Sequence, residues 1–374
     1  MRLIMRQRHC KICTLIGGAS RHFWGMRMNF NTPLFIVLHL SAFAFALSLA
    51  VCGFMLSARL LDAPVARSNH ISPIPTGAGI GIVAGLGAGL FALAMFYPRI
   101  GDHILIGQIA ALAFAVALLG LFDDVFVLGS KIKFMLMVIL ASASVYIVGV
   151  PTGLPLIIGE ISIPTWGGYI GGVLWIFVVM NAVNFMDGAN GIMGACMGIA
   201  FTTLAVVSLA VGQMTPAIIS IVMAASLLGF LPYNARNTAL IFSGDIGSLL
   251  CGFIFATLSL LLANRASEFG LLYVGPLLML PFLADILLTM ALRASRKENM
   301  LNAHNNHLYQ RLIKSGRSHL SVTMLYLLAG VFMSIVTMAG VYFSIIRSTF
   351  FVMLWVCVMT MIYLVMHTIL NKPK

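Results

Sequence analysis

Eleven apolar runs, each long enough to cross a lipid bilayer, dominate this 374-residue chain and leave few alternatives for its fold. A helix of roughly 20 apolar residues spans the hydrocarbon core and satisfies its own backbone hydrogen bonds there. The runs are continuous and do not alternate with period two, which argues against a membrane β-barrel. Only 9% of the residues are charged, against about a quarter in soluble proteins. We therefore predict an all-α, polytopic integral membrane protein.

Short connections join the predicted spans, so we expect a single membrane-embedded domain over residues 34–374 and no soluble domain. The spans are Leu34–Leu56, Gly77–Phe96, Ile104–Leu121, Phe134–Gly149, Trp166–Val183, Ile192–Val211, Pro216–Leu231, Ser248–Leu262, Leu271–Leu292, Leu320–Tyr342 and Thr349–Leu370. Residues 1–33 precede them as a basic lead.

Positive charge is distributed unevenly between the two sets of connections. The connections after the odd-numbered spans, together with the C-terminus, contain Arg59, Arg67, Lys131, Lys133, Arg236, Arg293, Arg296, Lys297, Arg311, Lys314, Arg317, Lys372 and Lys374. The opposite connections contain only Arg99, Arg265 and Arg347. Cytoplasmic loops of membrane proteins are enriched in Lys and Arg. We therefore expect a multi-pass membrane protein whose polar motifs open to the cytoplasm.

The basic lead opposes this orientation, because eleven alternating spans would place its six positive residues outside. Two interpretations are open. Translation starts at Met26 or Met28, which is the interpretation we favour, or the lead is cytoplasmic and the chain has ten spans. A cleaved signal peptide fits less well, because the apolar run is too long and no small-residue cleavage site follows it before Leu60.

Four of the ten carboxylates, Asp123, Asp124, Asp187 and Asp245, lie in short polar breaks on the predicted cytoplasmic side. An ionisable group beside the hydrocarbon costs free energy unless it has a partner or a function. The adjacent pair Asp123 and Asp124 would repel, and a divalent cation or a proton relieves such repulsion. The alternative interpretation is a solvated pair in a loop.

Two further motifs also have an ordinary structural interpretation. In NFMDGANGIMG, Asn184 and Asp187 would share a helix face, but Asn and Asp are also common in caps and turns. In GDIGS, Asp245 begins a predicted helix, where backbone N–H groups and a carboxylate could hold a phosphate-bound cation, or where the Asp simply caps the helix.

The longest cytoplasmic connection carries a cationic cluster of His304, His307 and Arg311. Such a cluster suits pyrophosphate oxygens or acidic lipid headgroups. Zinc binding is less favoured, because no third ligand has the usual spacing. A charge run in a cytoplasmic loop can also reflect topology alone.

Taken together, these segments resemble the polyprenyl-phosphate N-acetylhexosamine-1-phosphate transferase family of membrane enzymes, over nearly the whole chain. ISPIPTGAGIGI is similar to that family's PTPRGGG segment, LFDD to its Asp-Asp motif, NFMDGANG to NxxDGxDG, SGDIGS to GDxGS, and HNNH to its histidine motif. The resemblance implies that a lipid phosphate in the cytoplasmic leaflet attacks the β-phosphorus of a UDP-N-acetylated sugar. The products are the lipid-diphosphate-sugar and UMP.

The resemblance also implies roles for individual residues. Asp245, with Asp187, would bind Mg²⁺, for which Mn²⁺ could substitute. Asp123 and Asp124 would be catalytic and organise the phosphate of undecaprenyl phosphate, with Asp123 the better candidate for a base. The residues expected to bind nucleotide or sugar are Lys133, Asn184, Asp187, Asn190, Asn234, His304, His307 and Arg311. Asp285 also matches a family pattern, in a catalytic or a structural role.

Two residues depart from the family pattern. Asn190 stands where the family has a second Asp, and Ala78 stands where PTPRGGG has its Arg. The histidine motif lacks the triple histidine of the branch that loads a muramyl-pentapeptide. It is closer to the branch that starts O-antigen or related surface polysaccharides. We therefore expect UDP-GlcNAc, UDP-FucNAc or UDP-QuiNAc as the donor, and no nucleic-acid partner. A homodimer stays open.

A cation-coupled transporter is the alternative from a different class, in which the same aspartates would relay ions or protons. Transporter carboxylates tend to lie near the bilayer midplane on broken helices. These lie at the ends of predicted spans on one face. A non-catalytic membrane scaffold is a third interpretation, but it gives no reason for the acids to gather there.

Overall fold

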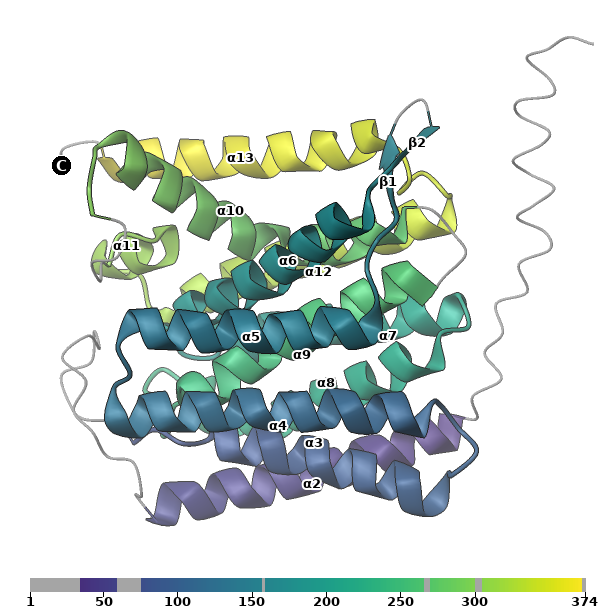
Figure 1. Ribbon diagram of the computed structural model, residues 1–374. Helices are drawn as coiled ribbons and strands as arrows, with labels where there is room; N and C mark the ends of the chain where they lie inside the picture. Colours follow the sequence, from purple (N-terminus) through teal and green to yellow (C-terminus); the bar gives the residue numbers. More distant parts are fainter. Residues whose placement is uncertain (1–33, 59–74, 157–158, 266–269, 300–304, 372–374) are drawn as a thin grey trace, which may run out of the picture.

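The computed structural model describes residues 34–58, 75–156, 159–265, 270–299 and 305–371. Within these ranges, eleven helices are long and apolar enough to cross a membrane, which confirms the predicted multi-pass, all-α class. The helices lie side by side in one bundle (Figure 1). The basic lead of residues 1–33 and the predicted ligand His304 lie outside the described residues.

The long helices are α2 (Leu34–Ala58), α3 (Gly79–Phe96), α4 (His103–Phe126), α5 (Ser130–Val148), α6 (Thr165–Met186), α7 (Ile192–Ala210), α8 (Met214–Asn234), α9 (Gly244–Arg265), α10 (Val274–Ser295), α12 (His319–Tyr342) and α13 (Thr349–Asn371). The 3₁₀ turn η1 (Leu271–Tyr273) precedes α10, and the short helix α11 (Leu308–Lys314) precedes α12.

Several helices extend beyond the apolar runs that predicted them, and these extensions carry the polar motifs. Helix α4 continues from the predicted end at Leu121 to Phe126, and α5 begins at Ser130 instead of Phe134. Helix α9 begins at Gly244, four residues before the prediction. Hydropathy marks contact with lipid, whereas a helix ends where its backbone hydrogen bonding ends. The acids that we expected in loops therefore lie mostly on terminal helical turns.

A small β-hairpin, absent from the prediction, connects α5 to α6. Strands β1 (Gly153–Leu156) and β2 (Gly159–Ser162) are antiparallel, with Leu154 opposite Ile161. The hairpin lies at the end of the bundle away from α11 (Figure 1). Four-residue strands are too short to show in a scan for membrane spans, and they leave the all-α class unchanged.

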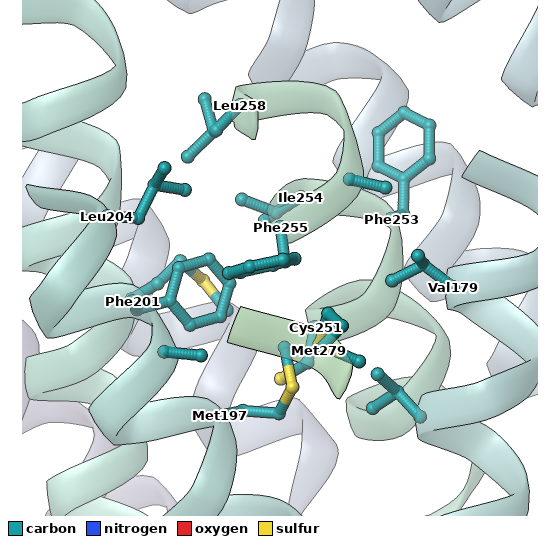
Figure 2. Close-up of a cluster of buried hydrophobic side chains, with 14 of the residues drawn as sticks. Val179, Met197, Phe201, Leu204, Cys251, Phe253, Ile254, Phe255, Leu258 and Met279 are labelled. Atoms are coloured by element: carbon teal, nitrogen blue, oxygen red, sulfur yellow. The ribbon is translucent and has the colours of Figure 1, made fainter. Parts of the chain in front are cut away.

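Helix α9 forms the centre of the bundle and is almost completely buried, whereas α2 and α13 are largely exposed. Figure 2 shows the packing around it, where side chains of α6, α7 and α10 surround the middle of α9. Phe255 of α9 meets Phe201 of α7 edge to face, with ring centroids 5.6 Å apart. Close packing of this kind fixes helix positions. Asp245 therefore begins the most firmly held helix of the protein.

The segment before α3 pairs with the segment before α9. Thr76 and Phe242 form a parallel bridge, and the N–H groups of Gly77 and Ala78 both donate to the carbonyl of Phe242, at 3.1 and 3.0 Å. The N–H of Gly79 donates to the carbonyl of Ser243 at 3.0 Å. This pairing places the PTGAGIGI segment directly beside the SGDIGS segment.

Candidate active site

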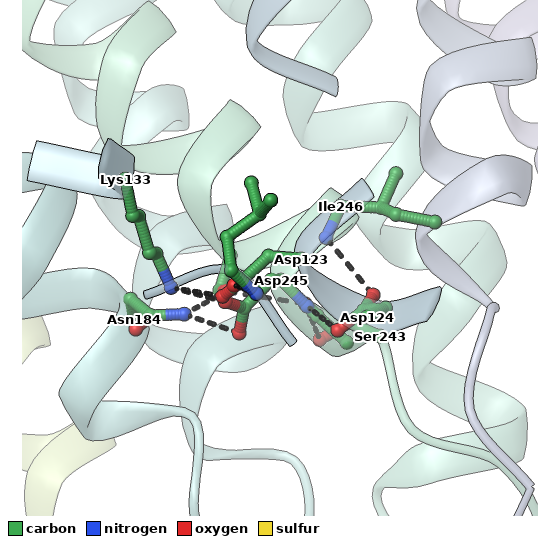
Figure 3. A network of polar contacts seen from close by, with 10 residues as sticks. Asp123, Asp124, Lys133, Asn184, Ser243, Asp245 and Ile246 are labelled. Atoms are coloured by element: carbon green, nitrogen blue, oxygen red, sulfur yellow. Dashed lines mark hydrogen bonds and ion pairs between the residues drawn. The ribbon is translucent and has the colours of Figure 1, made fainter. Parts of the chain in front are cut away.

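Lys133 joins two of the predicted acids, which come from different helices (Figure 3). Its Nζ lies 2.7 Å from Asp123 Oδ2 and also forms an ion pair with Asp245 Oδ2. The side chains of Lys133 and Asp123 are only 13% and 14% exposed, so water screens the pair weakly. The turns of α4, α5 and α9 that carry these residues thus meet at one point. The expected place of Lys133 beside the nucleotide stays a prediction.

Asn184, on the last turns of α6, adds a fourth helix to this cluster. Its Nδ2 donates to Asp245 Oδ1 at 2.7 Å and to Ser248 Oγ at 2.9 Å. Both oxygens of Asp245 therefore have donors, one from Lys133 and one from Asn184. Asn184 thus lies beside Asp245, and its expected contact with nucleotide or sugar stays a prediction.

Asp124 has a different role from its neighbour Asp123. The backbone N–H groups of Asp245 and Ile246 donate to Asp124 Oδ1 and Oδ2, at 3.0 and 3.4 Å. A carboxylate at this position accepts hydrogen bonds from N–H groups of the first turn of α9. Its negative charge also interacts favourably with the positive end of the helix dipole. One interpretation of the sequence is that Asp245 itself caps this helix. In the structure, Asp124 supplies the cap from α4. The cap leaves the Asp245 side chain available to the site.

Asp187 follows α6 directly and accepts a hydrogen bond from the Ser243 hydroxyl. Asn184 and Asp187 would share a helix face only if the helix continued through Asp187, and α6 ends at Met186. Loss of solvent around its carboxyl raises the pKa of Asp187 to about 8, with the Ser243 hydrogen bond opposing and the negative charges of Asp245 and Asp124 adding to the rise. A cation beside Asp187 would favour its ionised form at neutral pH.

The donor set fits a hard divalent cation, since it consists of carboxylate oxygens gathered at one end of the bundle. Among the described residues, no three carboxylate, imidazole or thiol groups are arranged to hold a metal ion by themselves. Mg²⁺ is usually bound by one or two carboxylates with water and substrate phosphates. Asp245 and Asp187 are the residues that would hold it here, with the substrate supplying further oxygens.

Asn190 and Asn234, predicted to line a nucleotide pocket, are buried and bound to backbone in this structure. Asn190 Nδ2 donates to the carbonyls of Arg236 and Asn237, at 2.8 and 3.0 Å. Asn234 Oδ1 accepts from the N–H of Gly191, and its Nδ2 donates to the carbonyl of Ile241. Both amides thus fasten the turn after α6 to the connection between α8 and α9. Contact of either residue with nucleotide stays a prediction.

We expect Asn190→Asp to lower the melting temperature, because a carboxylate has no N–H for the carbonyls of Arg236 and Asn237. An unpaired buried polar group costs about 1–3 kcal/mol. Asn264→Asp is the matched control, since Asn264 Nδ2 also donates to a carbonyl, that of Val148, but at a partly exposed position. Thermal unfolding in detergent measures both. Equal melting temperatures for the two variants would contradict the bracing role of Asn190.

The predicted cationic cluster does not form a single patch within the described residues. His307 is buried, with its ring stacked on those of Phe185 and Tyr309. Arg311 Nη2 donates to Asn371 Oδ1 at 2.7 Å, which directs the guanidinium toward the end of α13. Contact of Arg311 with pyrophosphate or sugar stays a prediction.

Several residues of the site were not predicted. Ser243 and Ser248 bind Asp187 and Asn184, and both belong to the SGDIGS motif, so their proximity to Asp245 was the available signal. Tyr309 donates from its hydroxyl to the carbonyl of Phe185 at 2.9 Å. Nothing in the local sequence around Tyr309 indicates this contact, which depends on the packing of α11 against α6.

Known proteins resemble this chain in the region that carries the cluster around Lys133. Residues 106–263 match the family model described as glycosyl transferase family 4. A probable undecaprenyl-phosphate N-acetylglucosaminyl 1-phosphate transferase of Bacillus subtilis is 32% identical over 280 residues, covering 73% of this chain and 75% of the relative. A decaprenyl-phosphate N-acetylglucosaminephosphotransferase of Mycobacterium tuberculosis is 30% identical over 312 residues, covering 74% and 75%.

A shorter similarity extends to a different branch. A phospho-N-acetylmuramoyl-pentapeptide-transferase of Staphylococcus aureus is 43% identical over 103 residues, covering 28% of this chain and 31% of the relative. The two longer similarities span about three quarters of both partners. The family model covers residues 106–263, a range that includes the cluster around Lys133. This chain belongs to the glycosyl transferase family 4 group of polyprenyl-phosphate N-acetylhexosamine-1-phosphate transferases.

Proposed function

We propose that this protein transfers N-acetylhexosamine 1-phosphate from a UDP-sugar to undecaprenyl phosphate at the cytoplasmic leaflet of the inner membrane, releasing UMP. The observation that carries the proposal is the meeting of Asp123, Lys133, Asn184 and Asp245 on terminal turns of four helices. A site at one end of a membrane bundle suits a reaction between a lipid-embedded acceptor and a water-soluble donor.

Phosphoryl transfer mainly requires positioning of the reactants and neutralisation of negative charge. In the proposed step, an oxygen of the lipid phosphate forms a bond to the β-phosphorus of the donor. The bond between that phosphorus and the oxygen bridging to the α-phosphorus breaks, and UMP leaves with the electron pair. A phosphate monoester is already largely ionised near pH 7, so the step needs no obligatory base.

The residues of this chain would share the work of positioning. Lys133 would neutralise phosphate charge when substrate competes with the carboxylates for its ammonium. Asp123 would orient the acceptor phosphate or accept its remaining proton. Asp245 and Asp187 would hold Mg²⁺, which when bound neutralises charge on the diphosphate.

We expect Asp123→Asn to lower turnover on the order of 10²-fold, since it removes the charge that holds Lys133 in place and any proton acceptor. The change keeps the size of the side chain and an oxygen that accepts from the N–H of Leu128, as Asp123 Oδ1 does at 2.8 Å. UMP release measured across pH tests this expectation. A normal rate at every pH would remove Asp123 from the proposed chemistry.

The two longer relatives transfer N-acetylglucosamine phosphate by their names, which supports UDP-GlcNAc as the first donor to test. The 6-deoxy sugars UDP-FucNAc and UDP-QuiNAc are the next candidates. We further propose that the product starts O-antigen or a related surface polysaccharide. This proposal is based on the HNNH motif, which lacks a triple histidine.

The identifying experiment incubates detergent-purified protein and undecaprenyl phosphate with a panel of UDP-N-acetylhexosamines, with and without Mg²⁺. The proposal predicts Mg²⁺-dependent UMP release with one or a few donors, and a matching lipid product by mass spectrometry. If no donor yields UMP while reconstituted protein carries cations across a liposome membrane, the transporter alternative replaces the proposal. The position of the acids at helix ends disfavours that alternative.

A further inference from the structure

We propose that Asp285 and Tyr309 are positioning residues that clamp the histidine-bearing segment 305–309 onto the turn that carries Asn184 and Asp187. This inference rests on the proposed function and goes beyond it, because neither residue belongs to the acid cluster around Lys133. Asp285 fixes the segment from α10, and Tyr309 links it to the end of α6.

Asp285 is a carboxylate inside a membrane-spanning helix, and it is 1% exposed. A buried charge of this kind requires partners. Its oxygens accept hydrogen bonds from the N–H groups of Leu308 and Tyr309, at 2.7 and 3.1 Å, and from the hydroxyls of Tyr326 and Thr289, at 2.6 and 3.2 Å. A carboxylate can accept about four hydrogen bonds, so these four donors occupy all of its acceptor sites. Asp285 therefore does not contact substrate, and it acts through the segment that it caps.

Tyr309 connects that capped segment to the acid cluster. Its ring is buried, and its hydroxyl donates to the carbonyl of Phe185, which lies between Asn184 and Asp187 in the chain. The ring of His307 stacks between Phe185 and Tyr309, with ring planes 24° and 10° from parallel. The histidine segment and the Asn184–Asp187 turn are thus held as one unit.

Gly188 makes this contact sterically feasible. A Cβ at residue 188 would overlap the Tyr309 hydroxyl and lie 3.0 Å from Tyr309 Cζ. Only glycine leaves room for the tyrosine to approach the turn that closely. The Tyr309 hydroxyl therefore occupies the space that a side chain at residue 188 would need. This steric relation can be tested with a double variant.

In the first experiment, Tyr309→Phe removes the hydroxyl and keeps the ring. We expect kcat/KM for the UDP-sugar to fall about three- to tenfold, as loss of one aligning hydrogen bond would cause, with KM for undecaprenyl phosphate unchanged. The matched control is Tyr169→Phe, since Tyr169 Oη donates to the carbonyl of Ser142 at 3.0 Å near the other end of α6. Wild-type kinetics for both variants would overturn the proposal.

A second experiment uses Gly188→Ala alone and combined with Tyr309→Phe. We expect the single Ala variant to lose activity about tenfold or more, and the double variant to regain part of it, because loss of the hydroxyl relieves the worst overlap. A general structural role of residue 188 would give no such rescue. If the double variant is no more active than Gly188→Ala, the proposed contact between Tyr309 and this turn is wrong.

Hydrogen–deuterium exchange of peptides covering 305–314 provides a readout that needs no activity. In Tyr309→Phe and in Asp285→Asn, exchange in this segment should rise about two- to tenfold, while peptides of α9 stay protected. Leu308 and Tyr309 donate to different oxygens of Asp285, and Asn replaces one of these oxygens with an NH2 group, which cannot accept a hydrogen bond. If wild-type protein transfers no sugar, the proposed function fails and this exchange still decides the clamp. Unchanged exchange in both variants would overturn it.

Discussion

Replacement of Asp245 with Asn is expected to abolish Mg²⁺-dependent UMP release, with a loss on the order of 10²–10³-fold or more. The amide keeps the size of the side chain and an oxygen that can accept from Asn184 Nδ2. It loses the negative charge that pairs with Lys133 and that would bind Mg²⁺. Because Asp245 begins the most buried helix, the rest of the site has little freedom to compensate.

Asp102→Asn is the matched control for this substitution. Asp102 lies at the opposite end of α4 and caps that helix, with its Oδ1 accepting from the N–H of Leu105 at 3.1 Å. Asn serves as a cap nearly as well as Asp. This variant should keep wild-type turnover and elute from a sizing column like the parent. Full turnover in Asp245→Asn would remove Asp245 from the metal site.

Gly120→Ala should be nearly as damaging, although residue 120 has no functional group. A Cβ there would lie 2.6 Å from the carbonyl carbon and oxygen of Asp245 and from Cα of Ile246. These are backbone atoms of α9 and cannot turn aside. Helix α4 would have to move away from α9, which would pull Asp124 off the N–H groups that it caps.

The expected result for Gly120→Ala is a melting temperature lowered by overpacking of about 1–3 kcal/mol and a turnover reduced on the order of 10²-fold. Gly107→Ala is a close control, because Gly107 lies on the same helix and a Cβ there would meet no atom within 4 Å. It should be neutral or slightly stabilising. If both alanine variants behave alike, close approach of α4 to α9 does not set the geometry of the site.

Much of this architecture could be predicted from residue patterns, because lipid demands long apolar helices. Each of the eleven predicted spans corresponds to a long apolar helix within the described residues, and the prediction that Asp245 lies at the start of a helix is confirmed. The helix ends were less accurate, since Asp123 and Lys133 lie on turns that continue past the last apolar residues. The hairpin of β1 and β2 was missed for a similar reason, as four-residue strands contribute little to hydropathy.

The contacts within the site depended on packing that no local pattern records. Lys133 and Asp245 are 112 positions apart, and Asn184 and Asp245 are 61 apart. The resemblance to a family indicated that these motifs act together and favoured Asp123 over Asp124 as a base, but it did not indicate that Asp124 caps α9. It also did not reveal that Asp285 is fully occupied by donors around α11.

In the proposed reaction, the acid cluster around Lys133 supports attack of a lipid phosphate on the β-phosphorus of a UDP-sugar. This reaction can be followed with undecaprenyl phosphate that carries ¹⁸O in its terminal oxygens, incubated with the purified protein, Mg²⁺ and the accepted donor. Mass spectrometry identifies the nucleotide and the lipid formed. We expect unlabelled UMP and an equal amount of a lipid-diphosphate-sugar that retains the label. UDP together with a lipid-monophosphate-sugar would contradict the proposed reaction, because the attack would then have occurred at the sugar carbon.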